Sequence, residues 1–212
     1  VTSYDQDAAI SLLKEAGYVI PSEGSDIREK EGVKLSFTLL YPDDDLHLAL
    51  AEIIQQNWAE INVEVILQAV PFETLVEDHL DARDFQAALV DLNLIDSPDP
   101  DPYPFWDQAQ ASGGQNYSQW DNRVASEYLE TARVTADMTE RARLYRNFQV
   151  IFSEETPALL LYNPVYSYAV DSQILGVRMG PIFDASDRFS TVTGWYLAAP
   201  VVEQPTEVQS TP

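Results

Sequence analysis

The spacing of apolar residues predicts three strands in the first half of the chain. Residues 33–41 carry an apolar side chain at every second position from Val33 to Leu39, which is the period of a strand with one buried face. Residues 63–70 form a second strand candidate. Residues 85–92 are apolar over most of their length, which predicts a strand buried on both faces.

Helices are predicted before and between these strands. The segment YDQDAAISLLKEAGY, residues 4–18, has apolar positions at helical spacing, and Gly17 stands where a left-handed C-cap belongs. Three aspartates follow the first strand, where acids favour the start of a helix. Five apolar residues share one face of that helix: Leu46, Leu50, Ile53, Ile54 and Trp58. Pro71 opens a further helix over residues 71–80.

The order of elements over residues 33–92 predicts the fold class. Strand, helix, strand, helix, strand is the pattern of parallel strands joined by right-handed crossovers. We therefore expect an α/β lobe with a parallel βαβαβ core, followed by helices and by strands near the end of the chain.

Two helices are predicted in the second half. Asp121 or Asn122 caps a helix that runs to about Thr135. Asp137 and Glu140 have the spacing of a capping box at the start of the next helix.

The end of the chain is predicted to be extended. Residues 158–170 predict two short strands around Asn163-Pro164. Residues 199–212 show no pattern and are expected to form a disordered tail.

The excess of acidic residues excludes some classes of binding partner. The chain has 12 basic and 35 acidic residues and a net charge of −23. Such a surface repels nucleic acid and anionic lipid, so neither is an expected partner. There are no cysteines, which excludes disulfides and thiolate chemistry. No apolar run approaches the roughly 18 residues of a membrane span. The sequence does not open with a signal peptide. It begins directly before a predicted helix, as a fragment would.

An acidic loop is expected at the ligand edge of the sheet. Ligands of open parallel sheets bind outside the carboxyl ends of the strands, where residues 41–43, residues 70–72 and the chain from Asn93 onward should meet. The segment DSPDPDPYPFWD, residues 96–107, leaves directly from the third strand. Its prolines disfavour both helix and strand pairing, which predicts a semi-rigid extended loop.

Five segments together carry a resemblance to a known family. They are YDQDAAISLLKEAGY (4–18), DSPDPDPYPFW (96–106), NYSQWDNRVASEYLETAR (116–133), TERARLYRNFQVIFSEETPALLLYNPVYSYAV (139–170) and GWYL (194–197). The fourth matches the pattern x-E-R-x-x-L-Y-x-x-x-Q-x-I-x-x-E-x-x-P at nearly every marked position. In this order they resemble the C-terminal half of the family 5 extracellular solute-binding proteins, the peptide-binding subunits of ABC importers.

The resemblance implies a type II periplasmic-binding fold, in which two lobes close over a ligand. Residues 1–198 would be the C-terminal lobe, with residues 199–212 as its tail. Full family members are about twice this length or more, so the N-terminal lobe is absent from this sequence. The chain would then carry about half of a binding site.

The resemblance also implies a function and a location. The chain would be the substrate-binding component of an ABC importer, capturing a peptide-like or other small polar solute, with the permease subunits as partners. It would be extracytoplasmic, in the periplasm or on the outer face of the cell membrane, and would touch the membrane only through a lipoprotein anchor or the permease. No cofactor is implied. The alternative is a ligand-sensing domain of the same fold that reports to a signalling or regulatory module.

The resemblance assigns ligand contacts to the acidic loop. In the dipeptide-binding relatives, the acid three residues before an Asp-Pro pair contacts the amino group of the ligand, and that position is Asp96 here. A cap of the loop is the alternative role for Asp96. Relatives often carry Trp at the position of Asn93, which would instead hydrogen-bond a peptide amide or a sugar hydroxyl. Ser126 stands where the family usually has Asp, at a position with an expected structural role.

Aromatic and amide side chains near this edge are the other candidates. Tyr41 ends the first strand, and Tyr103, Trp106 and Trp120 flank the acidic loop. An aromatic ring with a polar tip suits the floor of a pocket, but Trp106 would serve equally to pin the loop to the core. Asn116 either contacts a ligand or orders the turn that follows two glycines.

The distribution of charge bears on the ligand and on rival functions. No Lys or Arg lies between Arg83 and Arg123, so a bound carboxylate needs a partner from the missing lobe, or the ligand is neutral or cationic. A bare nickel ion is disfavoured because His47 and His79 lie on separate predicted helices. The acids of the loop lack the spacing of a calcium-binding EF-hand, and no hydrolase or phosphate-binding motif is present, so we expect neither a metal site nor an enzyme.

Overall fold

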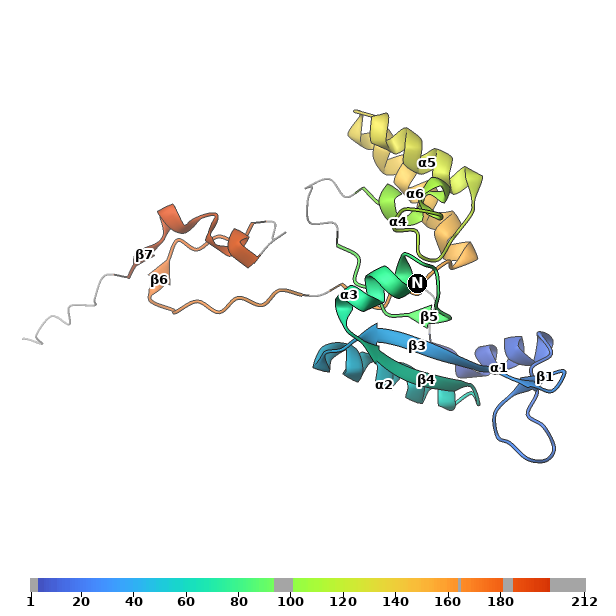
Figure 1. The fold of residues 1–212 in the computed structure, drawn as a ribbon. Coiled ribbons are helices and arrows are strands. Elements are labelled where there is room, and N and C mark those ends of the chain that lie inside the picture. Colours follow the sequence, from blue (N-terminus) through green and yellow to red (C-terminus); the bar gives the residue numbers. More distant parts are fainter. Residues whose placement is uncertain (1–3, 94–100, 164, 181–184, 199–212) are drawn as a thin grey trace, which may run out of the picture. The chain divides into compact units, whose positions relative to one another are not determined.

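A computed structural model describes residues 4–93, 101–163, 165–180 and 185–198 (Figure 1). These residues belong to two compact units. Unit 1 comprises residues 4–93, called the sheet half below, and residues 101–159, called the helical half. Unit 2 comprises the described residues from 160 to 198. In the part of the chain that the structure describes, no helix is long and apolar enough to cross a bilayer.

The centre of unit 1 is a parallel sheet of three strands. Strand β3 (Ser36–Pro42) lies between β4 (Glu64–Val70) and β5 (Ala87–Ala88), and both pairings are parallel. The predicted parallel core is thereby confirmed. Its outer strand is shorter than expected, because only two residues of the predicted stretch 85–92 pair with β3.

The first predicted strand divides into two. Val33 and Lys34 form a separate strand β2 (Val33–Lys34), which pairs antiparallel with β1 (Glu29–Lys30). The two residues between these strands, Glu31 and Gly32, both have positive φ, as a tight two-residue hairpin requires. Val33 is therefore exposed and does not continue the buried face of β3.

Both faces of the sheet are covered. Helix α2 (Asp45–Ala59) packs on one face, where Leu39 and Tyr41 join Val65 and Ala51 in a core cluster. The short helix α3 (Phe72–Thr74) and the π-helical η1 (Leu75–Leu80) cover the other face, which β3 reaches through Leu40. Alternate residues of β3 thus serve two cores, as expected for a central strand between two layers.

The predicted face of α2 is only partly correct. Leu50, Ile54 and Trp58 pack on the sheet, whereas Leu46 and Ile53 are exposed. The apolar face of α2 is narrower than predicted. Ala51, which was not included in the prediction, is fully buried against the sheet.

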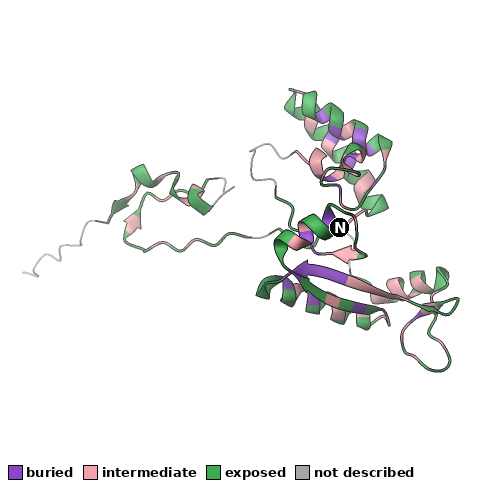
Figure 2. Ribbon diagram, viewed as in Figure 1, coloured by how far each residue is buried: buried purple, intermediate pink, exposed green. Residues whose placement is uncertain are grey.

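The helical half is a pair of long helices with a short lead-in. Helix α4 (Tyr103–Trp106) and η2 (Gln108–Gln110) precede α5 (Arg123–Val134) and α6 (Met138–Glu155). The last two helices pack around Trp120, Leu129 and Phe148. Figure 2 shows buried positions running along α5 where it faces α6.

The predicted helix ends agree with the structure in most cases. Asn122 caps α5, and Asp137 caps α6 by accepting a hydrogen bond from the Glu140 amide at 2.8 Å. The Glu140 carboxylate binds Arg143 and not the Asp137 amide. Only one of the two hydrogen bonds of a capping box is therefore formed. Gly17 has φ +91 after α1 (Gln6–Glu15), as the predicted left-handed cap requires.

Unit 2 is extended and lightly packed. Its strands β6 (Ile174–Leu175) and β7 (Tyr196–Leu197) pair antiparallel, and η3 (Ala185–Phe189) and η4 (Val192–Gly194) lie between them in sequence. The prediction of two strands within residues 158–170 is wrong for its described residues, 158–163 and 165–170, none of which is in a strand. An extended segment becomes a strand only beside another strand, and the described chain offers these residues none. The predicted tail, residues 199–212, lies outside the described residues.

Candidate ligand-binding site

The carboxyl ends of the strands in unit 1 meet as the sequence predicts. β3 and β4 end in register, with Pro42 opposite Val70, and the Asp43 amide donates to the Val70 carbonyl at 3.0 Å. β5 runs in the same direction and leads to Asp91 and Asn93. Side chains from three separate segments can therefore converge beyond this edge of the sheet, which is where open parallel sheets bind ligands.

A buried histidine stands at this edge between two carboxylates. Asp44 caps α2 and approaches His47 Nδ1 with its Oδ2 atom at 2.7 Å. Asp91, on the segment after β5, places its Oδ2 atom 3.4 Å from His47 Nε2. Hydrogen bonds from the His47 backbone amide and from its side chain hold the pKa of Asp44 below its ordinary value. The first contact has a local signal in the sequence, since Asp44 and His47 are three residues apart at a helix start, but the contact with Asp91 has none.

The predicted ligand residues of the sheet half lie at this edge in different environments. Tyr41 is buried in the core beneath α2 and is 7% exposed. Asn93 is exposed and follows Asp91. Asp96, the main predicted contact, lies outside the described residues, so its assignment stays a prediction.

In the helical half, the predicted aromatic residues pack on one another and on Arg133. The Trp106 ring meets Phe152 edge to face at 4.8 Å and belongs to the core cluster around α5 and α6. The Arg133 guanidinium lies 4.2 Å from the centre of the Tyr103 ring. Its Nε atom also contacts Asp101 Oδ2 at 2.9 Å. These contacts favour the pinning role for Trp106 and show that one acid of the loop is neutralised within the chain.

Asn116 is enclosed in a network of hydrogen bonds. Its side chain is fully buried and donates to the carbonyls of Asp107 and Trp120 at 3.1 and 2.9 Å. Its Oδ1 atom accepts from the Trp120 amide and from Ser118 Oγ. Both ends of the side chain are thus engaged within the loop, which favours the turn-ordering interpretation over a ligand contact.

Ser126 and Trp120 also hold this loop. Ser126 Oγ accepts from the Gln108 amide at 3.0 Å and is fully buried, in agreement with the structural role expected for it. Trp120 Nε1 donates to Glu155 Oε2 at 2.7 Å, which joins the loop to the end of α6.

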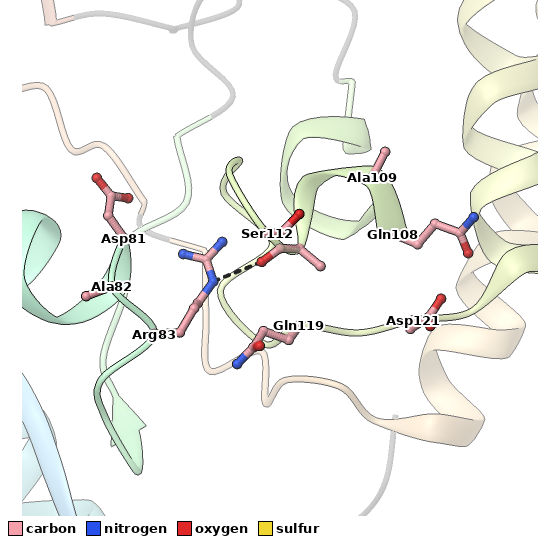
Figure 3. Close-up of a pocket in the computed structure, with 9 residues that line it drawn as sticks. Asp81, Ala82, Arg83, Gln108, Ala109, Ser112, Gln119 and Asp121 are labelled. Carbon is pink, nitrogen blue, oxygen red and sulfur yellow. Dashed lines mark hydrogen bonds between the residues drawn. The ribbon is translucent and has the colours of Figure 1, made fainter.

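A polar hollow lies elsewhere in unit 1, where η1 and the loop before α5 come together (Figure 3). It is open to solvent and has a volume of about 720 Å³. Its lining residues are Asp81, Ala82, Arg83, Gln108, Ala109, Ala111, Ser112, Gln119 and Asp121. The lining residues Asp81, Ala82 and Arg83 lie in the turn between η1 and β5, so the hollow lies toward the amino end of that strand, whereas the candidate site lies beyond its carboxyl end. Among the described residues, no group of three or more His, Asp or Glu side chains is arranged to hold a metal ion.

Comparison with known proteins identifies the family. The model of the bacterial extracellular solute-binding proteins, family 5 Middle, matches residues 1–116, which is more than half of the chain. The chain belongs to this family. The parallel sheet with helices on both faces agrees with the type II periplasmic-binding fold of its structural neighbours.

Individual family 5 proteins are similar over most of the chain. The oligopeptide-binding protein AppA of Bacillus subtilis is 27% identical over 197 residues, which are 92% of this chain and 35% of AppA. The dipeptide-binding protein of Escherichia coli is 25% identical over 186 residues, 85% of this chain and 32% of that protein. The structure of AppA in complex with a nonapeptide matches 93% of this chain and 38% of that chain with a TM-score of 0.74. The chain thus spans about a third of the length of the curated relatives it matches.

Proposed function

We propose that this chain is the C-terminal lobe of a solute-binding subunit of an ABC importer, with residues 1–198 as the lobe and residues 199–212 as a tail. It would capture a peptide-like or other small polar solute in a cleft completed by a second lobe. The observation that carries the proposal is the likeness to AppA, which extends over 93% of this chain and whose structure holds a nonapeptide. The converging strand ends at Asp43 and Asp91 add support, because the fold places ligands at that edge.

The charges at this edge favour a ligand with an amino group. Asp91 and Asp43 are exposed there, and the Asp96 position adds a third carboxylate in the sequence. The two arginines that flank Asp91 and Asp96 in the sequence are already engaged, Arg83 with backbone carbonyls and Arg123 with glutamates of its own helix. A carboxylate of the ligand would then be met by the second lobe, while this lobe meets the ammonium group.

The partners and the location follow from the same proposal. Permease subunits of an importer would receive the solute, and the protein would work outside the cytoplasm, held near the membrane by a lipid anchor or by the permease. The chain would bind and release its solute without chemical change, since no role in the proposal requires a reacting group.

Native mass spectrometry of the full-length protein tests the proposal first. A solute that copurifies would identify the ligand, and the dipeptide alanyl-alanine serves as the probe if none does. The isolated 212-residue chain should bind the same probe weakly or not at all, because affinity in this fold comes from closure of two lobes. Tight calorimetric binding by the isolated chain would show that the proposed site is misplaced.

A substitution in the acidic loop tests the assigned contact. Asp96→Asn in the full-length protein should weaken an amine-bearing ligand by roughly 1.5–3 kcal/mol, the usual contribution of a hydrogen bond to a charged group, and leave the unfolding midpoint nearly unchanged. Glu52→Gln, which removes one exposed carboxylate from α2, is the matched control and should change neither quantity. If Asp96→Asn lowers the midpoint while ligand affinity is intact, Asp96 is a structural cap.

A further inference from the structure

Arg83 is the only basic residue between Lys34 and Arg123, a stretch that is otherwise rich in acids. Carboxylates stand two residues before it, at Asp81, and directly after it, at Asp84, yet the described contacts of its guanidinium are with neutral groups. A solitary cation in an acidic region would ordinarily be expected to pair with one of the nearby carboxylates. The guanidinium of Arg83 instead donates to backbone carbonyls, which indicates a role in holding backbone segments together.

The guanidinium of Arg83 joins two distant segments of unit 1. Its Nε and Nη2 atoms donate to the carbonyls of Ala111 at 3.1 Å and Gly114 at 2.7 Å, with a longer contact of 3.4 Å to Gln110. Its Nη1 atom donates to the Leu80 carbonyl at the end of η1. Figure 3 shows the side chain reaching from the turn after η1 toward the loop that precedes α5.

An aromatic contact reinforces the same junction. The guanidinium carbon lies 5.0 Å from the centre of the Tyr117 ring, within the range of a cation–π interaction. The Tyr117 ring in turn packs against the core formed by Leu75 and Leu80 on the sheet. The loop of the helical half is therefore attached to the sheet half by the side chains of Arg83 and Tyr117 together.

The backbone of Arg83 is held in an unfavourable conformation. Its φ is +58°, in the left-handed region that favours glycine. A residue with a side chain persists there when the surrounding contacts over-determine it. The strained backbone conformation of Arg83 costs free energy. The hydrogen bonds of its guanidinium to the loop before α5 must therefore contribute enough to offset that cost.

This junction determines how the predicted ligand residues are placed. Tyr41 and Asn93 belong to the sheet half, whereas Tyr103 and Trp106 belong to the helical half. We propose that Arg83 is a positioning residue, which fixes the helical half against the sheet half and so sets the spacing between Asn93, which is exposed beyond β5, and the segment of α4 that carries Tyr103. Its consequence for a ligand rests on the proposed function, but the junction itself does not.

A distance measurement between the two halves tests the role of Arg83. Because the chain has no cysteines, spin labels can be attached at Glu52→Cys on α2 and Val150→Cys on α6, both at exposed positions. The labelled 212-residue chain should give one narrow distance peak by pulsed electron resonance. Arg83→Gly, which accepts the positive φ but removes the guanidinium, should lose that narrow peak in favour of a broad distribution. Arg123→Gln removes one exposed positive charge from α5 and should keep the peak narrow.

The possible outcomes separate positioning from stability. A lower melting temperature with an unchanged distance peak would overturn the proposal, because a purely stabilising contact alters how often the chain unfolds and leaves the native distance as it was. Arg83→Lys keeps the charge but loses the planar fork, so it should broaden the peak partly, and it replaces Arg83→Gly if that variant does not fold. The measurement needs no ligand, so a negative result rejects the positioning role and leaves the proposed function standing.

Discussion

Units 1 and 2 differ in how far their apolar side chains are buried. In unit 1, leucines and aromatics from separate elements meet in three core clusters, and residues such as Leu129 and Leu75 are almost fully buried. In unit 2, no described residue is buried, and Leu160 and Val165 are 72% and 88% exposed (Figure 2). Unit 2 also contains large apolar side chains, so the difference lies in which partners are available to bury them.

Unit 1 therefore has a hydrophobic core of its own, whereas the described part of unit 2 has none. Exposed runs of large apolar side chains mark surfaces that another part of a protein covers. The apolar segment 160–162, at the start of the described part of unit 2, is such a run. We infer that the remaining lobe, which the comparison with longer relatives leads us to propose, covers it.

A matched pair of leucines gives the largest contrast between the units. Leu129→Ala should lower the free energy of unfolding by about 2–5 kcal/mol, because it empties a fully buried site in the core of α5 and α6. Leu160→Ala removes the same atoms from an exposed site and should change it by less than about 0.5 kcal/mol. Denaturant titration of the isolated chain measures both. Equal effects would mean that unit 2 packs as firmly as unit 1.

Two hydrogen-bonding centres give a smaller contrast. Asn116→Ala removes the hydrogen bond to the buried Trp120 amide and those to the carbonyls of Asp107 and Trp120, which should cost about 1–3 kcal/mol of stability. Thr191 is the comparable centre in unit 2, where its Oγ1 atom contacts Trp195 Nε1 and the Arg178 carbonyl. Thr191→Ala should leave the main thermal transition in place, because that transition reports unit 1. A drop as large as that of Asn116→Ala would show that the units unfold together.

The smallest expected effect is a dependence on pH at the edge of the sheet. The pKa of Asp44 is lowered in the folded chain, so its contribution is complete above its ordinary value of about 4 and is lost as the pH falls through the lower folded value. Asp44→Asn keeps a good helix cap but loses the charge beside His47. Its melting temperature should be lower than that of the parent at pH 6, and the difference should shrink at an acidic pH below the ordinary pKa of an aspartate.

Asp171→Asn in unit 2 is the control for this effect. Asp171 accepts a hydrogen bond from the Gln173 amide in an exposed turn, so the variant should match the parent at both pH values. A difference between Asp44→Asn and the parent that persists at low pH would mean that the carboxylate charge is not what stabilises this edge.

The sequence predicted those features that depend on neighbouring residues. The caps formed by Gly17, Asn122 and Asp137 are local, and each was identified from residues within one helical turn. The parallel core was also predictable, because the alternation of strand and helix restricts the topology.

Features that depend on distant residues were not predictable in the same way. Arg83 binds carbonyls 27 to 31 residues further along the chain, and no pattern in the sequence connects them. The contact of His47 with Asp91 requires knowledge of where β5 ends. The prediction of strands within residues 158–170 was wrong for a related reason. An apolar pattern specifies a strand only where a partner strand exists, and the sequence pattern does not show whether one does.

Hydrogen exchange measured by mass spectrometry tests the central contrast most directly. It compares the isolated 212-residue chain with the full-length protein, peptide by peptide. We expect β3, β4 and the helices α5 and α6 to be protected in both. Peptides from residues 160–163 should exchange rapidly in the isolated chain and become protected only in the full-length protein. Slow exchange of these residues in the isolated chain would contradict the account, because it would show that unit 2 is already complete.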